Sequence, residues 1–125
     1  MKILSVDSSS VSASVSITEK GITLAESFIN NGLTHSQTLM PMVEKTLKDS
    51  GVSIKDIDLF AITNGPGSFT GVRIGIASVK GMADALNKKC VAVSTLEAIA
   101  EPLKDKDCIA CAVMDSRCNQ VYTAM

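Results

Sequence analysis

The first thirty residues alternate between apolar and small polar positions, a pattern typical of strands that bury one face. The apolar or alternating runs cover residues 3–6, 11–17 and 22–29, and Lys20-Gly21 forms a turn before the last of them. Connections this short favour antiparallel pairing between neighbouring strands. We therefore predict a three-stranded antiparallel meander.

The pattern becomes helical over residues 34–49, where Leu39, Met40, Val43 and Leu47 share one face. Thr34 or Ser36 suits the N-cap position of this helix. Pro41 either opens the main part of the helix or kinks it, and the sequence leaves both interpretations open.

Strands and helices alternate in the rest of the chain. We predict strands at 57–63 and 90–93, helices at 71–87 and 95–103, and a strand pair at 108–114 and 119–125. A meander followed by this alternation indicates an α/β fold, in which parallel strands extend the meander into a mixed sheet with helices packed on it. We expect residues 1–104 to form one subdomain and residues 105–125 to be the first strands of an incomplete second one.

The composition narrows the class of protein. The 125 residues are 46% hydrophobic, enough for one modest core, and the net charge is −1. Two arginines and four aromatic residues provide neither a positive field nor a stacking platform, so we do not expect the chain to bind nucleic acid alone. A strand begins almost at residue 1 and no apolar run reaches membrane-spanning length, so we expect a cytoplasmic protein with no membrane contact.

The metal-ligating residue types are few. Cys108 and Cys111 form a single CxxC, and no second pair follows at zinc-finger spacing. On a strand, residues three apart point to opposite faces. We therefore predict buried free thiols and no metal site, for all of Cys90, Cys108, Cys111 and Cys118. The only histidine, His35, is expected to cap the first helix or pack beneath it.

Two segments are candidates for anion or nucleotide binding. The loop between the predicted strand 57–63 and the next helix carries Gly65, Gly67, Ser68 and Gly71, and its backbone either cradles a phosphate or packs tightly as a turn. It matches neither the Walker loop nor GxGxxG.

The second candidate follows the first strand, where Asp7 precedes Ser8 and Ser9. The Asp7 carboxylate could hold Mg²⁺ through water near nucleotide phosphates. We favour the simpler interpretation that Asp7 hydrogen-bonds its own turn, because no catalytic base lies nearby.

The helix over residues 71–87 is apolar on more than one face, because its polar side chains occupy a narrow arc. Such a helix either lies wholly inside its own domain or contacts a partner, and we favour a partner because few elements remain to cover it. The predicted interface comprises Leu39, Met40, Val43, Ile74, Gly75, Ala77, Ser78, Gly81 and Met82.

Four motifs in order along the chain resemble those of the TsaB family, also called YeaZ. They are Asp7-Ser8-Ser9, Leu33-Thr34-His35-Ser36, Gly65-Pro66-Gly67-Ser68-Phe69-Thr70-Gly71 and Met114-Asp115-Ser116-Arg117. The resemblance implies the actin-like ATPase (ribonuclease H-like) fold of two subdomains, in a family whose members are longer than this chain.

The same resemblance implies a function. TsaB proteins are non-catalytic partners of the TsaD transferase, which makes N6-threonylcarbamoyladenosine (t6A) at position 37 of tRNAs. It implies a heterodimer with TsaD, or a homodimer when TsaD is absent, through the two helices that follow the meander. A TsaE-like ATPase would join a larger complex, and tRNA would be bound only through that complex. No cofactor is required of this chain, which leaves room for weak or shared binding of ATP or ADP.

Two positions indicate whether the resemblance extends to catalytic activity. TsaD carries a His-x-x-x-His metal motif after its own glycine loop and helix, and here Thr95 and Ile99 stand in place of the two histidines. A hydroxyl and an alkyl group cannot replace two imidazoles as ligands, so we expect no transferase or glycoprotease activity. The alternative is a small ATPase or phosphotransferase that uses Asp7 and the loop 65–71. A peptidase is disfavoured because the sequence offers no nucleophile–base pair.

Overall fold

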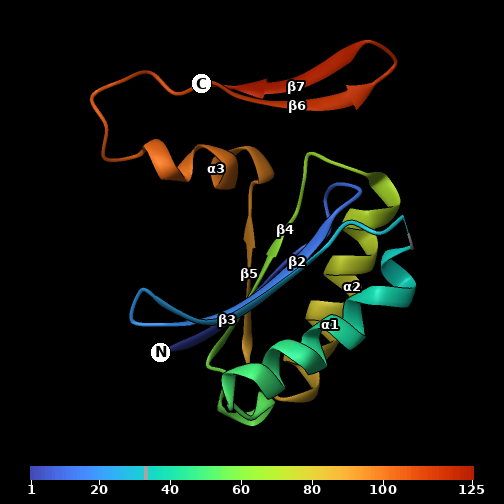
Figure 1. Cartoon of the computed structure of the whole chain (residues 1–125), viewed down its shortest axis with the longest axis vertical. Helices are drawn as coiled ribbons and strands as arrows, with labels where there is room; N and C mark the ends of the chain where they lie inside the picture. Colours follow the sequence, from blue (N-terminus) through green and yellow to red (C-terminus); the bar gives the residue numbers. More distant parts are fainter. Residues whose placement is uncertain (33) are drawn as a thin grey trace.

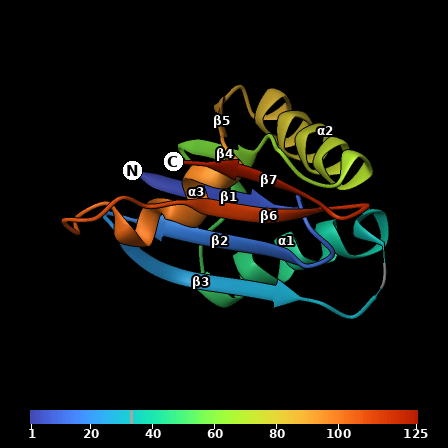
Figure 2. The same cartoon turned by 90° about the horizontal axis from the view of Figure 1, so that it is seen from above.

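The computed structural model describes residues 1–32 and 34–125. Its main element is a five-stranded mixed sheet in the order β3-β2-β1-β4-β5 (Figures 1 and 2). The pairs β1–β2 and β2–β3 are antiparallel, whereas β1–β4 and β4–β5 are parallel. The strands are β1 (Lys2–Asp7), β2 (Ala13–Glu19), β3 (Ile22–Ile29), β4 (Leu59–Thr63) and β5 (Lys89–Val93). The predicted meander and its parallel extension are confirmed.

Two helices, α1 (His35–Ser50) and α2 (Phe69–Ala85), lie side by side on one face of this sheet (Figure 1). α1 packs on β2 and β3, and α2 packs on β4 and β5. The core between the layers contains Leu4, Ile17, Phe60, Leu39, Val43 and Val79, each at most 1% exposed. Pro41 lies inside α1, whose N-cap is Thr34, so this proline does not open the helix.

A short 3₁₀ turn, η1 (Ile54–Asp56), leads from α1 into β4. After β5 come α3 (Thr95–Ala100), η2 (Glu101–Leu103) and a separate hairpin of β6 (Ala112–Arg117) and β7 (Gln120–Ala124). The hairpin lies beyond the end of the sheet at which β4 and β5 finish, and α3 packs against β6 (Figure 1). This separation fits the predicted boundary near residue 104, which stays a prediction. In the parts described, no helix combines the length and apolar character needed to cross a membrane.

The predicted strand limits are wrong at three places. Val11 precedes β2 and is 66% exposed, and Ile57 lies in the turn before β4, where it is buried. Residues 108–111 belong to no strand, because β6 begins only at Ala112, where β7 supplies a partner. Apolar character alone does not make a strand when no neighbouring strand is in register.

The prediction of buried thiols is also wrong, since all four cysteines are exposed. Cys90 lies on β5, an edge strand whose residues 89–92 are all exposed. Cys108 and Cys111 lie in the irregular segment before β6, and Cys118 lies in the hairpin turn.

Candidate functional site

Two loops meet where β1 and β4 end: the β1–β2 loop (residues 8–12) and the glycine loop (residues 64–68), which leads into α2. Asp7 orders the first of them. Its Oδ1 atom accepts hydrogen bonds from the Ser9 backbone N–H at 3.0 Å, the Ser9 hydroxyl at 2.6 Å and the Thr63 hydroxyl at 2.7 Å. Asp7 therefore hydrogen-bonds its own turn and ties it to β4, which agrees with the favoured interpretation.

The glycines let these loops approach each other closely. A Cβ atom at Gly67 would lie 2.4 Å from the Ser9 carbonyl oxygen, and one at Gly71 would lie 2.3 Å from the Ser8 carbonyl oxygen. The Ser68 N–H donates to the Ser9 carbonyl at 2.7 Å, and the Ser8 hydroxyl donates to the Gly71 carbonyl at 2.7 Å. Gly65 adopts φ +104°, which only glycine tolerates easily.

Several backbone donors at the start of α2 already have partners. The Ser68 hydroxyl accepts from the Gly71 N–H at 3.2 Å, and the Ser68 carbonyl accepts from the Val72 N–H at 2.8 Å. Ser8 and Ser9 are at most 1% exposed, so neither faces solvent. The geometry supports the tight-packing interpretation of Gly65, Gly67 and Gly71, and anion binding here stays a prediction.

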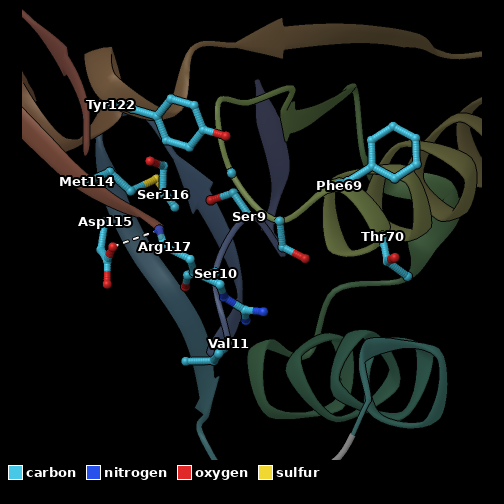
Figure 3. Close-up of a pocket in the computed structure, with 12 residues that line it drawn as sticks. Ser9, Ser10, Val11, Phe69, Thr70, Met114, Asp115, Ser116, Arg117 and Tyr122 are labelled. Carbon is cyan, nitrogen blue, oxygen red and sulfur yellow. Dashed lines mark hydrogen bonds between the residues drawn. The ribbon is translucent and has the colours of Figure 1, made fainter. Parts of the chain in front are cut away.

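A cleft of about 580 Å³ separates these loops from the β6–β7 hairpin. One wall is formed by Ser9, Ser10, Val11 and residues 67–70, the other by residues 114–117 and Tyr122. In Figure 3, the side chains of Arg117 and Tyr122 extend from the hairpin toward the loop that carries Ser9 and Ser10. The lining combines hydroxyl groups with one guanidinium, of Arg117, and one carboxylate, of Asp115, so these two charges cancel and the cleft has no net charge that favours an anion over a cation. Among residues 1–32 and 34–125, no three His, Cys, Asp or Glu side chains gather as a metal site.

The sequence singles out residues of only one wall of this cleft, the wall formed by the β1–β2 loop and the glycine loop. The motif at residues 114–117 does not indicate this position, and neither does the sequence around Tyr122, because nothing in their spacing shows that the hairpin folds back over the β1–β2 loop. The aromatic residue Phe69 was not singled out either. It is 70% exposed, and the Arg73 guanidinium lies 4.0 Å from its ring centroid, which is cation–π distance.

The predicted helix interface divides into buried and exposed residues. Leu39 and Val43 are 1% exposed and Gly75 is buried, so these three belong to the core of the chain and cannot contact a partner directly. A Cβ atom at Gly75 would lie 2.1 Å from the Ser8 hydroxyl oxygen. The remaining six residues, which we call the helix patch, are the exposed Met40, Ala77 and Gly81 and the half-buried Ile74, Ser78 and Met82.

Comparison with known proteins agrees with this architecture. Residues 29–125 match the family model of TsaD, the tRNA N6-adenosine threonylcarbamoyltransferase. The tRNA threonylcarbamoyladenosine biosynthesis protein TsaB of Bacillus subtilis is 33% identical over 100% of this chain and 55% of its own length. For Escherichia coli TsaB the identity is 37%, over 99% of this chain and 54% of the relative. YeaZ from Pseudomonas aeruginosa superposes with a TM-score of 0.86 at 34% identity, over 98% of this chain and 58% of that structure.

The chain belongs to the TsaB/YeaZ family. It spans about half the length of the curated TsaB relatives it matches. The likeness to YeaZ and to the TsaD-type domain confirms the predicted actin-like, ribonuclease H-like α/β fold.

The TsaB motif that contains His35 joins α1 to the β1–β2 loop. His35 is the first residue of α1, and its Nε2 atom lies 2.7 Å from the Ser10 carbonyl oxygen. Its ring also packs near Gly71, where a Cβ atom would be 3.0 Å from His35 Cδ2. His35 thus packs beside the start of α2 and does not cap α1. The first motif residue, Leu33, lies outside the described residues.

The two positions that the resemblance aligns with TsaD histidines differ in their surroundings. Thr95 begins α3 and is 4% exposed, and its N–H donates to the Gly65 carbonyl at 2.9 Å. Its hydroxyl oxygen has no hydrogen-bond partner among the residues described. Ile99, one turn later, is 46% exposed.

Proposed function

We propose that this chain acts as a non-catalytic partner of a TsaD-type transferase in t6A biosynthesis. Its TsaB relatives are named as tRNA threonylcarbamoyladenosine biosynthesis proteins, and its family model is that of the transferase. The observation that carries the proposal is the exposure of small side chains on α2, at Ala77 and Gly81. We place the chain in the cytoplasm, where its proposed partner would modify tRNA.

The two sides of α2 explain why a partner fits there. Gly71, Gly75, Val79 and Ala83 are buried against the sheet, so α2 needs no further apolar side to complete its own domain. The helix patch nevertheless continues along α2, and apart from the neighbouring backbone of α2 itself, no atom of the described residues lies within 4 Å of where a Gly81 Cβ would be. Small side chains let a second helix approach closely and bury apolar surface on both sides.

The occupant we propose for the helix patch is the paralogous transferase, with a second copy of this chain taking its place when the transferase is absent. A paralogue shares the fold and therefore offers comparable helices, so that two helices from each protein form one bundle. Met40 is 44% exposed on α1, and its flexible side chain can adapt to either partner.

We propose that the chain is not a catalyst because two of its side chains lack the chemistry of metal ligands. Thr95 and Ile99 provide a hydroxyl and an alkyl group at the positions that the resemblance aligns with two metal-binding imidazoles. A TsaE-like ATPase and tRNA are proposed to reach the chain only within the larger complex.

The two-part organisation is retained as a proposal: residues 1–104 as the actin-like subdomain and residues 105–125 as the start of the second. It is supported by the hairpin, which forms its own sheet. The alternative, nucleotide binding near Asp7, Ser8 and Ser9, would use the cleft that Ser9 and Ser10 border, although Ser8 and Ser9 are themselves almost fully buried. Titration with ATP tests it. Weak or shared binding is compatible with the partner role, whereas tight binding with hydrolysis by the chain alone favours the ATPase alternative.

Reconstituted tRNA modification tests the function itself. The chain, a bacterial TsaD, a TsaE-type ATPase and threonylcarbamoyl adenylate are mixed with unmodified tRNA, and t6A is measured by mass spectrometry of nucleosides. We expect t6A only when TsaD is present, and more of it with this chain than without it. Formation of t6A by the chain without TsaD, or no stimulation of TsaD by the chain, would contradict the proposal.

A further inference from the structure

The CxxC pair lies in the connector, the irregular segment of residues 104–111 between η2 and β6. Both Cys108 and Cys111 are exposed free thiols. The strand geometry that would have pointed their side chains to opposite faces is absent, since β6 begins at Ala112. Two neighbouring, accessible thiols on non-strand backbone are chemically different from the buried pair that the sequence predicts.

The backbone around the pair is free to form the turn that a disulfide needs. Four extended residues hold their end Cα atoms about 10 Å apart, whereas a disulfide requires roughly 4.4–6.8 Å. Within the described chain, residues 109–111 make no backbone hydrogen bond outside the β6–β7 ladder, and the Cys108 N–H bonds locally to the Lys106 carbonyl at 2.9 Å. The β6–β7 register begins at Ala112, so closing the turn breaks no strand pairing.

The two sulfur atoms make few contacts that would oppose disulfide formation. The only hydrogen bond recorded for either thiol in the described structure joins Cys111 Sγ to the Thr123 hydroxyl, at 3.3 Å. A thiol is a weak hydrogen-bonding group, so the loss of this hydrogen bond costs little free energy. Ile109, between the two cysteines, is 86% exposed and anchors the segment to no core.

The other two cysteines are unsuited to pair with this one. Cys118 follows the whole length of β6, so about seven residues of extended chain, or roughly 20 Å, separate it from Cys111. Cys90 lies on β5, in the other sheet. Cys108 and Cys111 are thus the pair that can react within one chain.

We propose that Cys108 and Cys111 form a reversible thiol–disulfide modification site for small disulfides of the oxidised-glutathione class. One cysteine thiolate attacks a sulfur of the small disulfide, which forms a mixed disulfide and releases one glutathione thiolate. The second cysteine thiolate attacks the protein sulfur and releases the other. The two cysteine thiols lose two electrons and two protons in total, and the two glutathione thiols gain them.

The position of the site gives the modification a consequence. Exposed disulfides are more easily reduced than buried structural ones, which suits a reversible modification. The ring closed by the bond shortens the connector that precedes β6, and β6 carries residues 114–117 of the cleft wall. The inference concerns the connector alone and does not depend on the helix patch or on t6A synthesis.

Tryptic mapping tests the proposal directly, because cleavage after Lys89, Lys104, Lys106 and Arg117 separates the connector pair from Cys90 and from Cys118. Cys90 lies on peptide 90–104, both connector cysteines lie on 107–117, and Cys118 lies on 118–125. The folded 125-residue chain is treated with oxidised glutathione at pH 8, quenched with N-ethylmaleimide and digested without reductant. We expect peptide 107–117 to lose two hydrogen masses and to escape alkylation, and dithiothreitol to reverse both changes.

Single substitutions provide the controls. With Cys108→Ser or Cys111→Ser, the remaining connector thiol should keep its glutathione adduct, because no second thiol can displace it. Cys90→Ser and Cys118→Ser should leave the disulfide yield unchanged. Recovery of peptide 107–117 with two alkylated thiols or two glutathione adducts, or linked to peptide 118–125 or to another chain, would overturn the proposal.

Discussion

The close contact between α2 and the β1–β2 loop gives the sharpest test of the fold. In Gly75→Ala, the added Cβ would lie 2.1 Å from the Ser8 hydroxyl oxygen and 2.9 Å from Ile62 Cδ1. The Ser8 hydroxyl cannot move freely, because Ser8 is fully buried and donates to the Gly71 carbonyl at 2.7 Å. The substitution must therefore break this hydrogen bond or separate α2 from the sheet.

The expected magnitude follows from three contributions to the free energy of unfolding. Alanine is favoured over glycine in a helix by about 1 kcal/mol. Overpacking a buried site costs about 1–3 kcal/mol, and a buried hydrogen bond left unmade costs about 1–3 kcal/mol. We expect Gly75→Ala to destabilise the chain by about 3 kcal/mol, a large share of the total for a domain of this size.

Gly81→Ala is the matched control on the same helix. Among the described residues, only the neighbouring backbone of α2 lies within 4 Å of its added Cβ, so only the helix preference acts, and we expect about 0.5–1 kcal/mol of stabilisation. Urea unfolding followed by circular dichroism at low protein concentration measures both variants. Adding Ser8→Ala to Gly75→Ala should recover part of the loss. Equal stability of the Gly75→Ala and Gly81→Ala variants would refute the packing account.

Three further predictions concern single side chains. Thr95→Val should leave the free energy of unfolding unchanged or raise it by up to about 1 kcal/mol, because the Thr95 hydroxyl is buried without a partner among the described residues; a clear loss by urea unfolding would show that it has one. The Lys2 backbone N–H holds the pKa of Asp58 below its usual value, so this contribution to stability should be present above the unfolded-state pKa and be lost as pH falls through the folded-state pKa. An NMR titration that finds an ordinary pKa for Asp58 would contradict this. Partial desolvation of its side chain, and secondarily Asp84, raises the pKa of the Cys90 thiol although Cys90 is exposed overall, so alkylation at pH 8 should be slower in the folded chain than after unfolding in urea, and equal rates would contradict this.

Periodicity located the main elements because each buries one face. The alternation in the first thirty residues places β2 and β3 within two residues of their observed starts, and the stripe of Leu39 and Val43 is the buried face of α1. The prediction of a strand at residues 108–111 is wrong because their apolar character does not show which of these residues have a pairing partner on β7. Strand pairing depends on two segments, so the sequence of one segment alone does not predict it.

The helix interface was only partly predictable for a geometric reason. Gly75, Ser78 and Gly81 recur every three residues, whereas a helix turns once in 3.6. Each step therefore moves about 60° around the axis, and Gly75 and Gly81 lie about 120° apart. One end of the series faces the sheet and the other faces solvent, so a single interface cannot contain both.

The second wall of the cleft was unpredictable for another reason. Arg117 and Tyr122 reach the β1–β2 loop only because α3 and the connector carry the hairpin back over the end of the sheet. No pattern of apolar and polar residues within 112–124 predicts this position of the hairpin.

Binding to the transferase tests the central claim most directly. Gly81→Glu adds a charged side chain to the helix patch without touching the core, and Ala98→Glu adds the same side chain to an exposed position of α3. Light scattering coupled to size exclusion, with purified TsaD at matched concentrations, measures complex formation by each variant. We predict that the original chain and Ala98→Glu bind TsaD and that Gly81→Glu does not, while all three unfold at similar urea concentrations. Undiminished binding by Gly81→Glu, or no binding by the original chain, would contradict the account.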